Sequence, residues 1–203
     1  MEYTTGVSRR LRTPPRHIGF APRGFSLAEV LVVLVIFGIL ILIAAPRMSL
    51  APARTRSAAN TTGSTLLAAQ RAAVSRQQNV VISFDAPGKR IRVHYDANGD
   101  GVIQATEHAY WQPLPEGVVF GRAGAPAGRV GTAAVSFRGR QGGLPAVFFM
   151  RNGSASEEGG FYLATALDQS RGAASSVRMV VVDRATGRPN WQVYSGGAWK
   201  TEF

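Results

Sequence analysis

The longest apolar stretch of the chain runs from Phe25 to Ala45 and contains one ionisable residue, Glu29. A helix needs about 20 predominantly apolar residues to cross a bilayer, so this stretch predicts a transmembrane helix over residues 25–45. A carboxylate at membrane depth costs about 2.5–3.5 kcal/mol on insertion scales, which indicates that Glu29 has a partner or a task. Five arginines and one glutamate precede the stretch. Because basic flanks tend to stay in the cytoplasm, we expect the N-terminus inside and the rest of the chain outside.

Two simpler interpretations of this segment compete with that prediction. A secretory signal peptide needs a short apolar core of about 7–15 residues before a small-x-small cleavage site. Here the apolar run is longer, and Pro46 follows Ala44 and Ala45 at once. A plain signal anchor would account for the length of the run, but it leaves the carboxylate of Glu29 unexplained.

The residues around Glu29 resemble the N-terminal signal of a known family. Gly24 is followed by Phe25, the fifth residue after that glycine is Glu29, and a long apolar segment comes next. This pattern resembles the class III signal of type IV pilins and type II secretion pseudopilins. The resemblance implies that a prepilin peptidase removes residues 1–24 as a leader by cutting between Gly24 and Phe25. It also implies that the same enzyme methylates the new N-terminal amine of Phe25.

The resemblance gives Glu29 and Pro46 roles in assembly. In the family the glutamate is thought to pair with the N-terminal amine of a neighbouring subunit, which would offset much of the burial cost of both charges. Pro46 matches the position where family helices bend as they leave the membrane, because a proline inside a helix removes a hydrogen bond and kinks it. The leader, rich in arginine and proline, is longer than many in this family, and the true start of the protein could lie further along the chain.

Composition restricts the classes of function. Without residues 1–24 the chain has 18 basic and 11 acidic residues, a formal charge of +7. It has no cysteine, so an exported domain must be held together by its core although export would permit disulfides. Of the three histidines, His17 lies in the leader, and His94 and His108 lie in or beside strand-like segments without an evident nucleophile or zinc partner. We therefore expect a protein that is not an enzyme.

The period of the apolar residues divides the mature chain into a helix and a β domain. A long helix is predicted over residues 25–78, with an apolar stripe that includes Thr62, Leu66, Ala69 and Ala73. Short alternating strands with glycine-rich turns follow over residues 79–203, and residues 121–131 are expected to form a mobile loop. The strand-like segments are 80–84, 90–95, 110–114, 118–120, 133–137, 146–150, 161–165, 177–182 and 191–194.

The C-terminal half resembles the GspH/FimT group of minor pilins. The residues that carry this resemblance are Phe149–Ser156, Phe161–Leu163 and Val177–Arg188. The group implies an α+β fold in which a long N-terminal helix packs on two small antiparallel sheets. It also implies a structural subunit of a type II secretion pseudopilus, anchored in the bacterial inner membrane with the β domain in the periplasm. Its expected partners are other pseudopilin subunits, the prepilin peptidase and the exported protein.

A second motif offers a cation site. Residues 96–107 fit the calcium-loop pattern D-x-[DN]-x-[DN]-G-x5-E without a mismatch. Asp96, Asn98 and Asp100 would supply side-chain oxygens, Val102 a backbone carbonyl and Glu107 a bidentate carboxylate. The competing interpretation is a hairpin connection, because Asn-Gly and Asp-Gly also favour tight turns. The flanking segments look like strands and not like the paired helices of an EF-hand, so both interpretations stay open.

DNA is the other candidate ligand. The arginine-rich domain would attract phosphates, and some FimT-type minor pilins of type IV pili bind incoming DNA. The DNA-binding members show a Gly-Arg-x-Arg pattern near the C-terminus, whereas this chain has Gly187-Arg188-Pro189-Asn190 and lacks the second arginine. A minor pilin that primes pilus assembly or binds DNA is therefore the weaker alternative. The sequence does not choose between a secretion system and a pilus.

Overall fold

A computed structural model describes residues 25–44 and 50–202. The chain divides into two compact units, Met1–Met48 and Ser49–Phe203. In the first unit, helix α1 (Leu27–Ala44) begins after Ser26, whose Oγ accepts a hydrogen bond from the backbone N–H of Ala28 at 3.3 Å. The described side chains of α1 are exposed on every side of the helix. Within the described residues, 25–44 and 50–202, no helix combines the length and hydropathy needed to cross a membrane.

The predicted helix over residues 25–78 is described as two helices, α1 and α2 (Ala51–Arg76). Residues 45–49, including Pro46, lie outside the described residues. Pro52 stands in the first turn of α2, where a missing backbone N–H does not interrupt the helix. The buried face of α2 follows the predicted stripe and consists mostly of small residues: Thr55, Ala58, Ala59, Thr62, Gly63, Leu66, Ala69 and Ala73.

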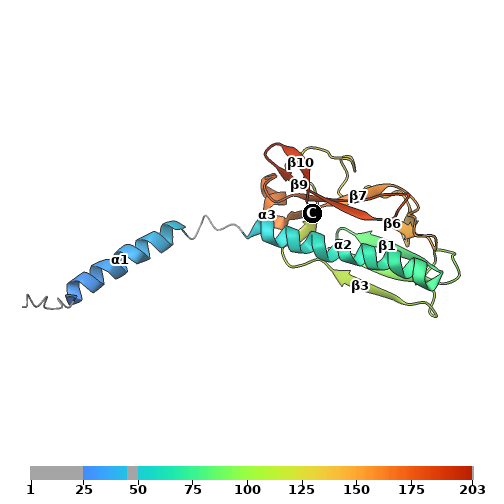
Figure 1. Cartoon of the computed structure of the whole chain (residues 1–203), viewed down its shortest axis with the longest axis horizontal. Helices are drawn as coiled ribbons and strands as arrows, with labels where there is room; N and C mark the ends of the chain where they lie inside the picture. The colour runs from blue at the N-terminus through green and yellow to red at the C-terminus, as the bar shows by residue number, and fades with distance from the viewer. Residues whose placement is uncertain (1–24, 45–49, 203) are drawn as a thin grey trace, which may run out of the picture. The chain divides into compact units, whose positions relative to one another are not determined.

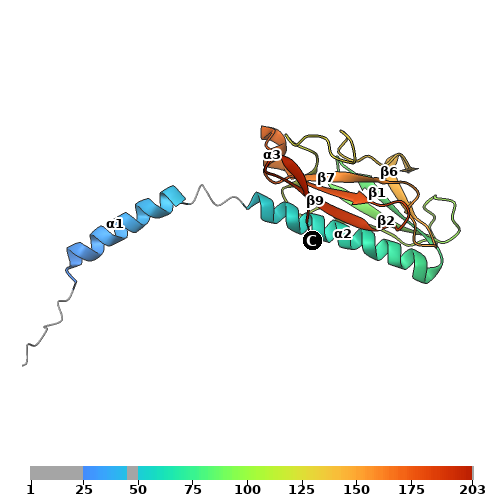
Figure 2. The ribbon, with the colours of Figure 1, turned by 45° about the horizontal axis from the view of Figure 1, so that its top comes forward.

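The rest of the second unit consists of two antiparallel sheets that pack with α2 (Figures 1 and 2). The first sheet has the order β3-β2-β1-β6-β5, and its strands are β1 (Asn79–Asp85), β2 (Arg90–Asp96), β3 (Ala109–Pro113), β5 (Arg140–Gln141) and β6 (Leu144–Phe149). The second has the order β10-β9-β8-β7-β4, and its strands are β4 (Val118–Phe120), β7 (Gly159–Thr165), β8 (Arg178–Val182), β9 (Pro189–Ser195) and β10 (Ala198–Thr201). The α+β class with two small sheets is therefore confirmed.

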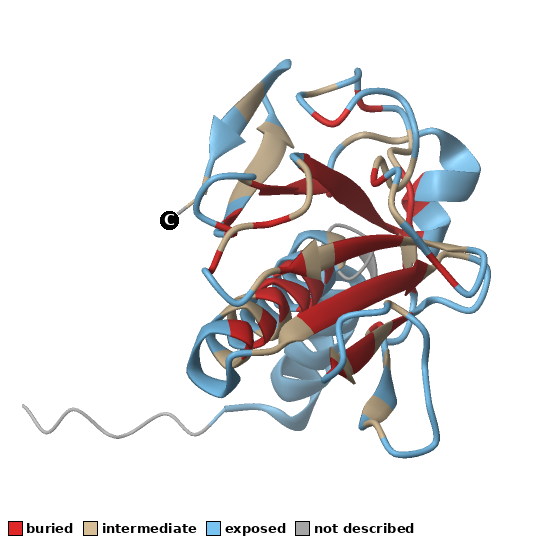
Figure 3. Cartoon of the chain, turned by 90° about the vertical axis from the view of Figure 1, so that its right-hand side faces the viewer, coloured by how far each residue is buried: buried red, intermediate tan, exposed pale blue. Residues whose placement is uncertain are grey.

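The main core lies between α2 and the two sheets, where Figure 3 shows the buried faces. Four phenylalanines meet there, and the rings of Phe84 and Phe137 stack with their centroids 5.2 Å apart. Phe161 packs on both Phe84 and Phe120, at centroid distances of 5.1 and 5.7 Å. Offset and edge-on ring pairs of this kind stabilise a core beyond the area that they bury. No cysteine is needed to hold this core together.

One predicted strand, residues 133–137, is wrong. This segment forms only an isolated bridge between Val135 and Phe161, because Phe137 turns into the core instead of continuing a ladder. Its ring lies against Gly159, where even a Cβ would come within 2.8 Å of the ring. The structure adds three elements that the pattern did not predict: β5, β10 and the short helix α3 (Ala166–Arg171).

The loop over residues 121–131 is irregular, but its end is tied to the second sheet. The hydroxyl of Tyr162 accepts a hydrogen bond from the backbone N–H of Gly128 and donates one to the carbonyl of Gly131, both at 2.7 Å. Ala125 and Val130 are buried in a small second cluster with Tyr162 and Met179. The loop therefore covers the outer face of the second sheet.

Candidate functional site

The predicted processing and assembly residues lie at the start of α1. Phe25 lies two residues before the first residue of the helix and is 80% exposed, and Glu29 is in the first turn. Ser26 and Glu29 have the spacing of a capping box, in which a serine at the helix start accepts from an early N–H and an acidic residue three positions on favours the helix N-terminus. The sequence contains this signal, and it gives Glu29 a local role besides a partner's amine. Gly24 and Pro46 lie outside the described residues.

The loop between β2 and β3 holds the predicted calcium ligands. Asp96 is buried at the end of β2, and its two carboxylate oxygens accept from the backbone N–H groups of Gly99 at 2.7 Å and Gly101 at 3.0 Å. Asp100 is exposed and accepts from the N–H of Val102 at 2.7 Å. That hydrogen bond lowers the pKa of Asp100. These carboxylates stabilise the turns of the loop itself.

The carboxylate of Glu107 does not serve only the set of predicted calcium ligands, because it also contacts the loop backbone and His94. Its carboxylate accepts from the N–H groups of Ala97 at 3.0 Å and Gln104 at 3.2 Å. Its Oε2 also lies 2.9 Å from His94 Nε2, and both side chains are almost fully buried. Burial acts to raise the pKa of Glu107, but the hydrogen bonds from His94 and the two backbone amides lower it on balance.

A buried polar chain continues from His94 into the first sheet. The Nε2 of Gln141 lies 2.8 Å from His94 Nδ1 and donates to the carbonyl of Gly101 at 2.9 Å. The Oε1 of Gln141 accepts from the hydroxyl of Ser83 at 2.9 Å. If Gln141 donates to Nδ1, then Nε2 of His94 carries the proton that Glu107 accepts. His94 is therefore a fully buried residue of β2 that links Glu107 of the loop to Gln141, and Gln141 in turn links it to Ser83 of β1. Its place in a strand-like segment of the sequence did not reveal this role.

This arrangement bears directly on the calcium prediction. Each carboxylate of the proposed set already accepts hydrogen bonds from the protein, and Glu107 is directed at His94. Within the described ranges there is no group of three or more histidine, aspartate or glutamate side chains placed to hold a metal ion. A bound Ca²⁺ would require these oxygens to leave their present donors. We therefore expect residues 96–107 to act as a turn stabilised by its own hydrogen bonds, and a melting experiment with and without calcium tests this expectation.

Comparison with known protein families shows which family the chain belongs to. The model of the prokaryotic N-terminal methylation motif matches residues 21–45, which include Gly24, Phe25 and Glu29. The model of the type II transport protein GspH matches residues 58–187, which span most of α2 and both sheets up to the β8–β9 turn. The chain belongs to the GspH family. Its prepilin-type N-terminus and its family together indicate a subunit that is processed, anchored in the membrane and assembled with other pilin-like subunits.

Two solved structures of the minor pseudopilin EpsH from the type II secretion system of Vibrio cholerae are similar to this GspH-family chain. The first is 14% identical, with a TM-score of 0.44, and the match covers 72% of this chain and 98% of that one. The second is 13% identical, with a TM-score of 0.39 and coverage of 73% and 94%. No curated protein matches this chain.

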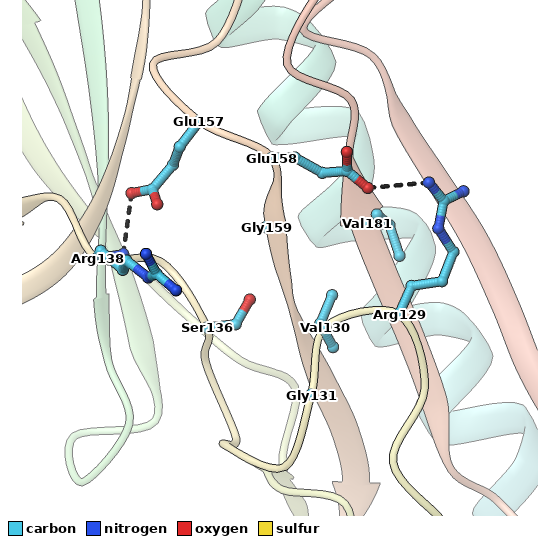
Figure 4. A pocket seen from close by; sticks show the side chains of 9 residues that line it. All are labelled: Arg129, Val130, Gly131, Ser136, Arg138, Glu157, Glu158, Gly159 and Val181. Atoms are coloured by element: carbon cyan, nitrogen blue, oxygen red, sulfur yellow. Dashed lines mark hydrogen bonds and ion pairs between the residues drawn. The ribbon is translucent and has the colours of Figure 1, made fainter.

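Two surface hollows are candidate binding sites. One, of about 500 Å³, is lined by two arginines and two glutamates on the loops around the start of β7, and one arginine and one glutamate form an ion pair (Figure 4). Arg129 pairs with Glu158 at 2.9 Å, and Glu157 accepts from the backbone N–H groups of Arg138 at 2.9 Å and Gly139 at 2.7 Å. Its charges balance within the protein, and it contains neither His94 nor His108.

The second hollow, of about 510 Å³, lies between α2 and β9 beside the Gly187–Asn190 segment. Arg71 and Arg188 line it together with Gln70, Asn190 and Trp191. Both arginines are exposed, so phosphates could reach them. The place that the second arginine of the DNA-binding pattern would occupy is taken by Asn190.

Proposed function

We propose that this GspH-family protein is a minor pseudopilin of a type II secretion system, built into a short filament that is anchored in the inner membrane. The observation that carries the proposal is the GspH model match over residues 58–187, directly downstream of a prepilin-type N-terminus. The β domain would lie in the periplasm, where it contacts other pseudopilins and the protein to be exported.

The physical basis of assembly is the composition of α1. Its described side chains are apolar apart from Glu29 and are exposed on all sides, so the helix gains by contact with lipid or with other apolar helices. Cleavage after Gly24 would create an amine at Phe25, four residues before Glu29. When subunits pack side by side, that amine and the carboxylate of a neighbour's Glu29 would neutralise each other and fix the register of the helices.

The processing step has a direct test. The protein is expressed with its prepilin peptidase and purified from inner membranes, and its intact mass is measured. We expect the chain to begin at Phe25 and to carry one additional methyl group. Gly24→Leu is expected to leave the leader attached, because a side chain at this position would obstruct the extended backbone in the protease. An unprocessed wild-type chain would refute this part of the proposal.

The alternative machine is a type IV pilus, where a FimT-like minor pilin would prime assembly or bind DNA. Exposed Arg71 and Arg188 favour this alternative, and Asn190 weighs against it. Deletion of the gene separates the two. We expect loss of secretion into the medium with normal piliation and normal DNA uptake. Normal secretion with lost piliation or DNA uptake would favour the pilus instead.

A further inference from the structure

Two arginines and a tryptophan form an exposed cluster on the outer face of β2 and β3. The guanidinium carbon of Arg90 lies 4.0 Å from the centroid of the Trp111 ring, and that of Arg92 lies 5.0 Å from it. Arg90 also pairs with Asp85 through a 2.8 Å contact. Arg92 stands directly opposite Trp111 in the β2–β3 register. The cluster therefore presents cations held in place by an aromatic ring.

Arg92 feels the charge of Asp85 only at a distance, whereas Arg90 is in direct contact with it. Among the described residues it makes no ion pair, and its Nη2 donates only to the backbone carbonyl of Gln141, at 3.1 Å. Its Nε is buried and has no hydrogen-bond partner within the described part of the chain. Burial lowers the pKa of Arg92 and the neighbouring charge of Arg90 adds to this effect, while Asp85 opposes it. A partly desolvated guanidinium without an ion pair in the described part of the chain is suited to a carboxylate from outside.

The backbone beside this cluster is a free strand edge. β3 is the last strand of its sheet and pairs only with β2 (Figure 1). Tyr95 N–H donates to the carbonyl of His108 at 2.9 Å, and Leu114 N–H donates to that of Lys89 at 2.8 Å. Because inward and outward hydrogen bonding alternate along an antiparallel strand, the N–H and C=O groups of Ala109 and Trp111 point away from the sheet. Pro113 ends this edge, since it has no N–H.

We propose that an extended acidic segment of another protein adds to the first sheet along β3 and places a carboxylate on Arg92. Strand addition would supply main-chain hydrogen bonds to Ala109 and Trp111, and the guanidinium would supply specificity. Together the free edge and a guanidinium without an ion pair in the described part of the chain define a surface for one kind of partner. This inference goes beyond the proposed function, because it holds whether the filament belongs to a secretion system or to a pilus.

Two other occupants fit this surface less well. A nucleic acid would use the tryptophan for base stacking, but guanidinium groups already lie over the Trp111 ring. A second copy of this chain would bring its own Arg90 and Arg92 to the same edge, and the chain without residues 1–24 has a formal charge of +7. Opposed like charges are destabilising in paired strands. The partner is therefore expected to be acidic and different from this chain.

The test uses the full chain in a non-ionic detergent and three fluorescent probes. The first is a capped peptide of alternating valine and glutamate, the second has lysine in place of glutamate, and the third is an oligothymidylate. We expect the glutamate peptide to bind, the lysine peptide not to bind, and the oligothymidylate to bind at least tenfold more weakly. Arg92→Gln is expected to weaken binding of the glutamate peptide about tenfold, the effect of losing one charge-assisted pair.

Matched variants separate this surface from general attraction by charge. Arg184→Gln removes the same charge from an exposed turn of the second sheet and should change the affinity less than twofold. Arg92→Lys keeps the charge without the planar fork and should weaken binding almost as much as Arg92→Gln. Ala109→Pro removes one outward N–H at a position where an edge strand tolerates proline, so it should also weaken binding. The melting temperature of each variant confirms that it is folded.

Several results would overturn the proposal. These are equal effects of Arg92→Gln and Arg184→Gln, unchanged affinity in Ala109→Pro, oligothymidylate binding as tight as that of the glutamate peptide, or no peptide binding at millimolar concentration. Self-association of the wild-type chain that Arg92→Gln abolishes would instead assign the edge to a second copy. If Arg92→Gln fails to fold, the decision rests on Arg92→Lys and Ala109→Pro.

Discussion

A glycine in the middle of α2 is expected to stabilise the protein although glycine is a poor helix former. Gly63 is buried, and the indole of Trp191 from β9 lies directly against it. A Cβ at this position would come within 2.5 Å of Trp191 Cε2 and 2.6 Å of Nε1. The same Nε1 donates to the carbonyl of Ala59 at 3.0 Å, so the indole cannot move away without breaking that hydrogen bond.

Gly63→Ala therefore sets two opposing contributions against each other. Helix propensity favours alanine by about 1 kcal/mol. Overpacking costs about 1–3 kcal/mol, and loss of the bond from Trp191 to Ala59 costs about 0.5–1.5 kcal/mol. We expect a net destabilisation of about 0.5–3.5 kcal/mol, which corresponds to a fall in melting temperature of roughly 1–14 °C for a domain of this size.

The assay is thermal unfolding of the full chain, followed by tryptophan fluorescence. Ser64→Ala is the matched control, because Ser64 is the next residue of the same helix and is exposed; it should leave the melting temperature unchanged or slightly raised. Trp191→Leu removes the indole, so adding Gly63→Ala to that variant should cost less than it costs in the wild type. A rise in melting temperature for Gly63→Ala in the wild type would refute the packing argument.

Four further predictions concern charged residues and calcium. Arg178 is 5% exposed and holds Glu202 by a two-pronged contact of 2.9 and 3.2 Å, and Glu202 also pairs with Arg56 at 3.3 Å, so Arg178→Met should destabilise the protein by about 1.5–3 kcal/mol in chemical denaturation; a loss below 1 kcal/mol would contradict the role of this pair. Hydrogen bonds from Arg178 lower the pKa of Glu202, so the stability from this pair should be present above the unfolded pKa of about 4.3 and be lost as pH falls through the lower folded value. Glu202→Gln should flatten that acid dependence, and an unchanged pH profile would count against it. Glu107→Gln should speed hydrogen exchange at the amide of Ala97 without changing exchange in β8, and equal acceleration in both places would show global destabilisation instead. Because protein donors already occupy the carboxylates of residues 96–107, we expect the same melting temperature with chelator and with millimolar calcium; a rise with calcium would establish a metal site.

The elements that could be predicted from the sequence are those fixed by local periodicity. The stripe of Leu66, Ala69 and Ala73 follows from the helical repeat, and it is buried as expected. The alternation at the start of β2 likewise follows from side chains that face opposite sides of a strand, whereas β1 and β8 are apolar runs that are buried on both faces. Residues 133–137 show the same alternation but do not form a strand, because the core takes up Phe137. Local pattern does not reveal such a competition.

The parts of the site that were missed depend on partners far apart in the chain. A glycine is required at position 63 because the indole of Trp191 packs against it, and the role of His94 follows from its contacts with Glu107 and Gln141. The calcium-loop pattern specifies the order of oxygen-bearing residues, but it does not specify where their oxygens point. In this structure they point at backbone amides and at His94. The Ser-x-x-Glu spacing of residues 26–29 could be read from the sequence, and the structure shows its serine half, a hydrogen bond from the Ala28 N–H to Ser26 Oγ.

The most direct test of the proposed function is secretion in the parent bacterium with the gene deleted and replaced by variants. The measured quantity is the fraction of a type II substrate that reaches the medium, with the amount of processed protein in the membrane as the control. We predict that wild-type protein restores secretion and that Glu29→Val does not, although the variant is cleaved and present at the normal level. Normal secretion in the deletion strain, or full restoration by Glu29→Val, would contradict the role of this chain as an assembled pseudopilin.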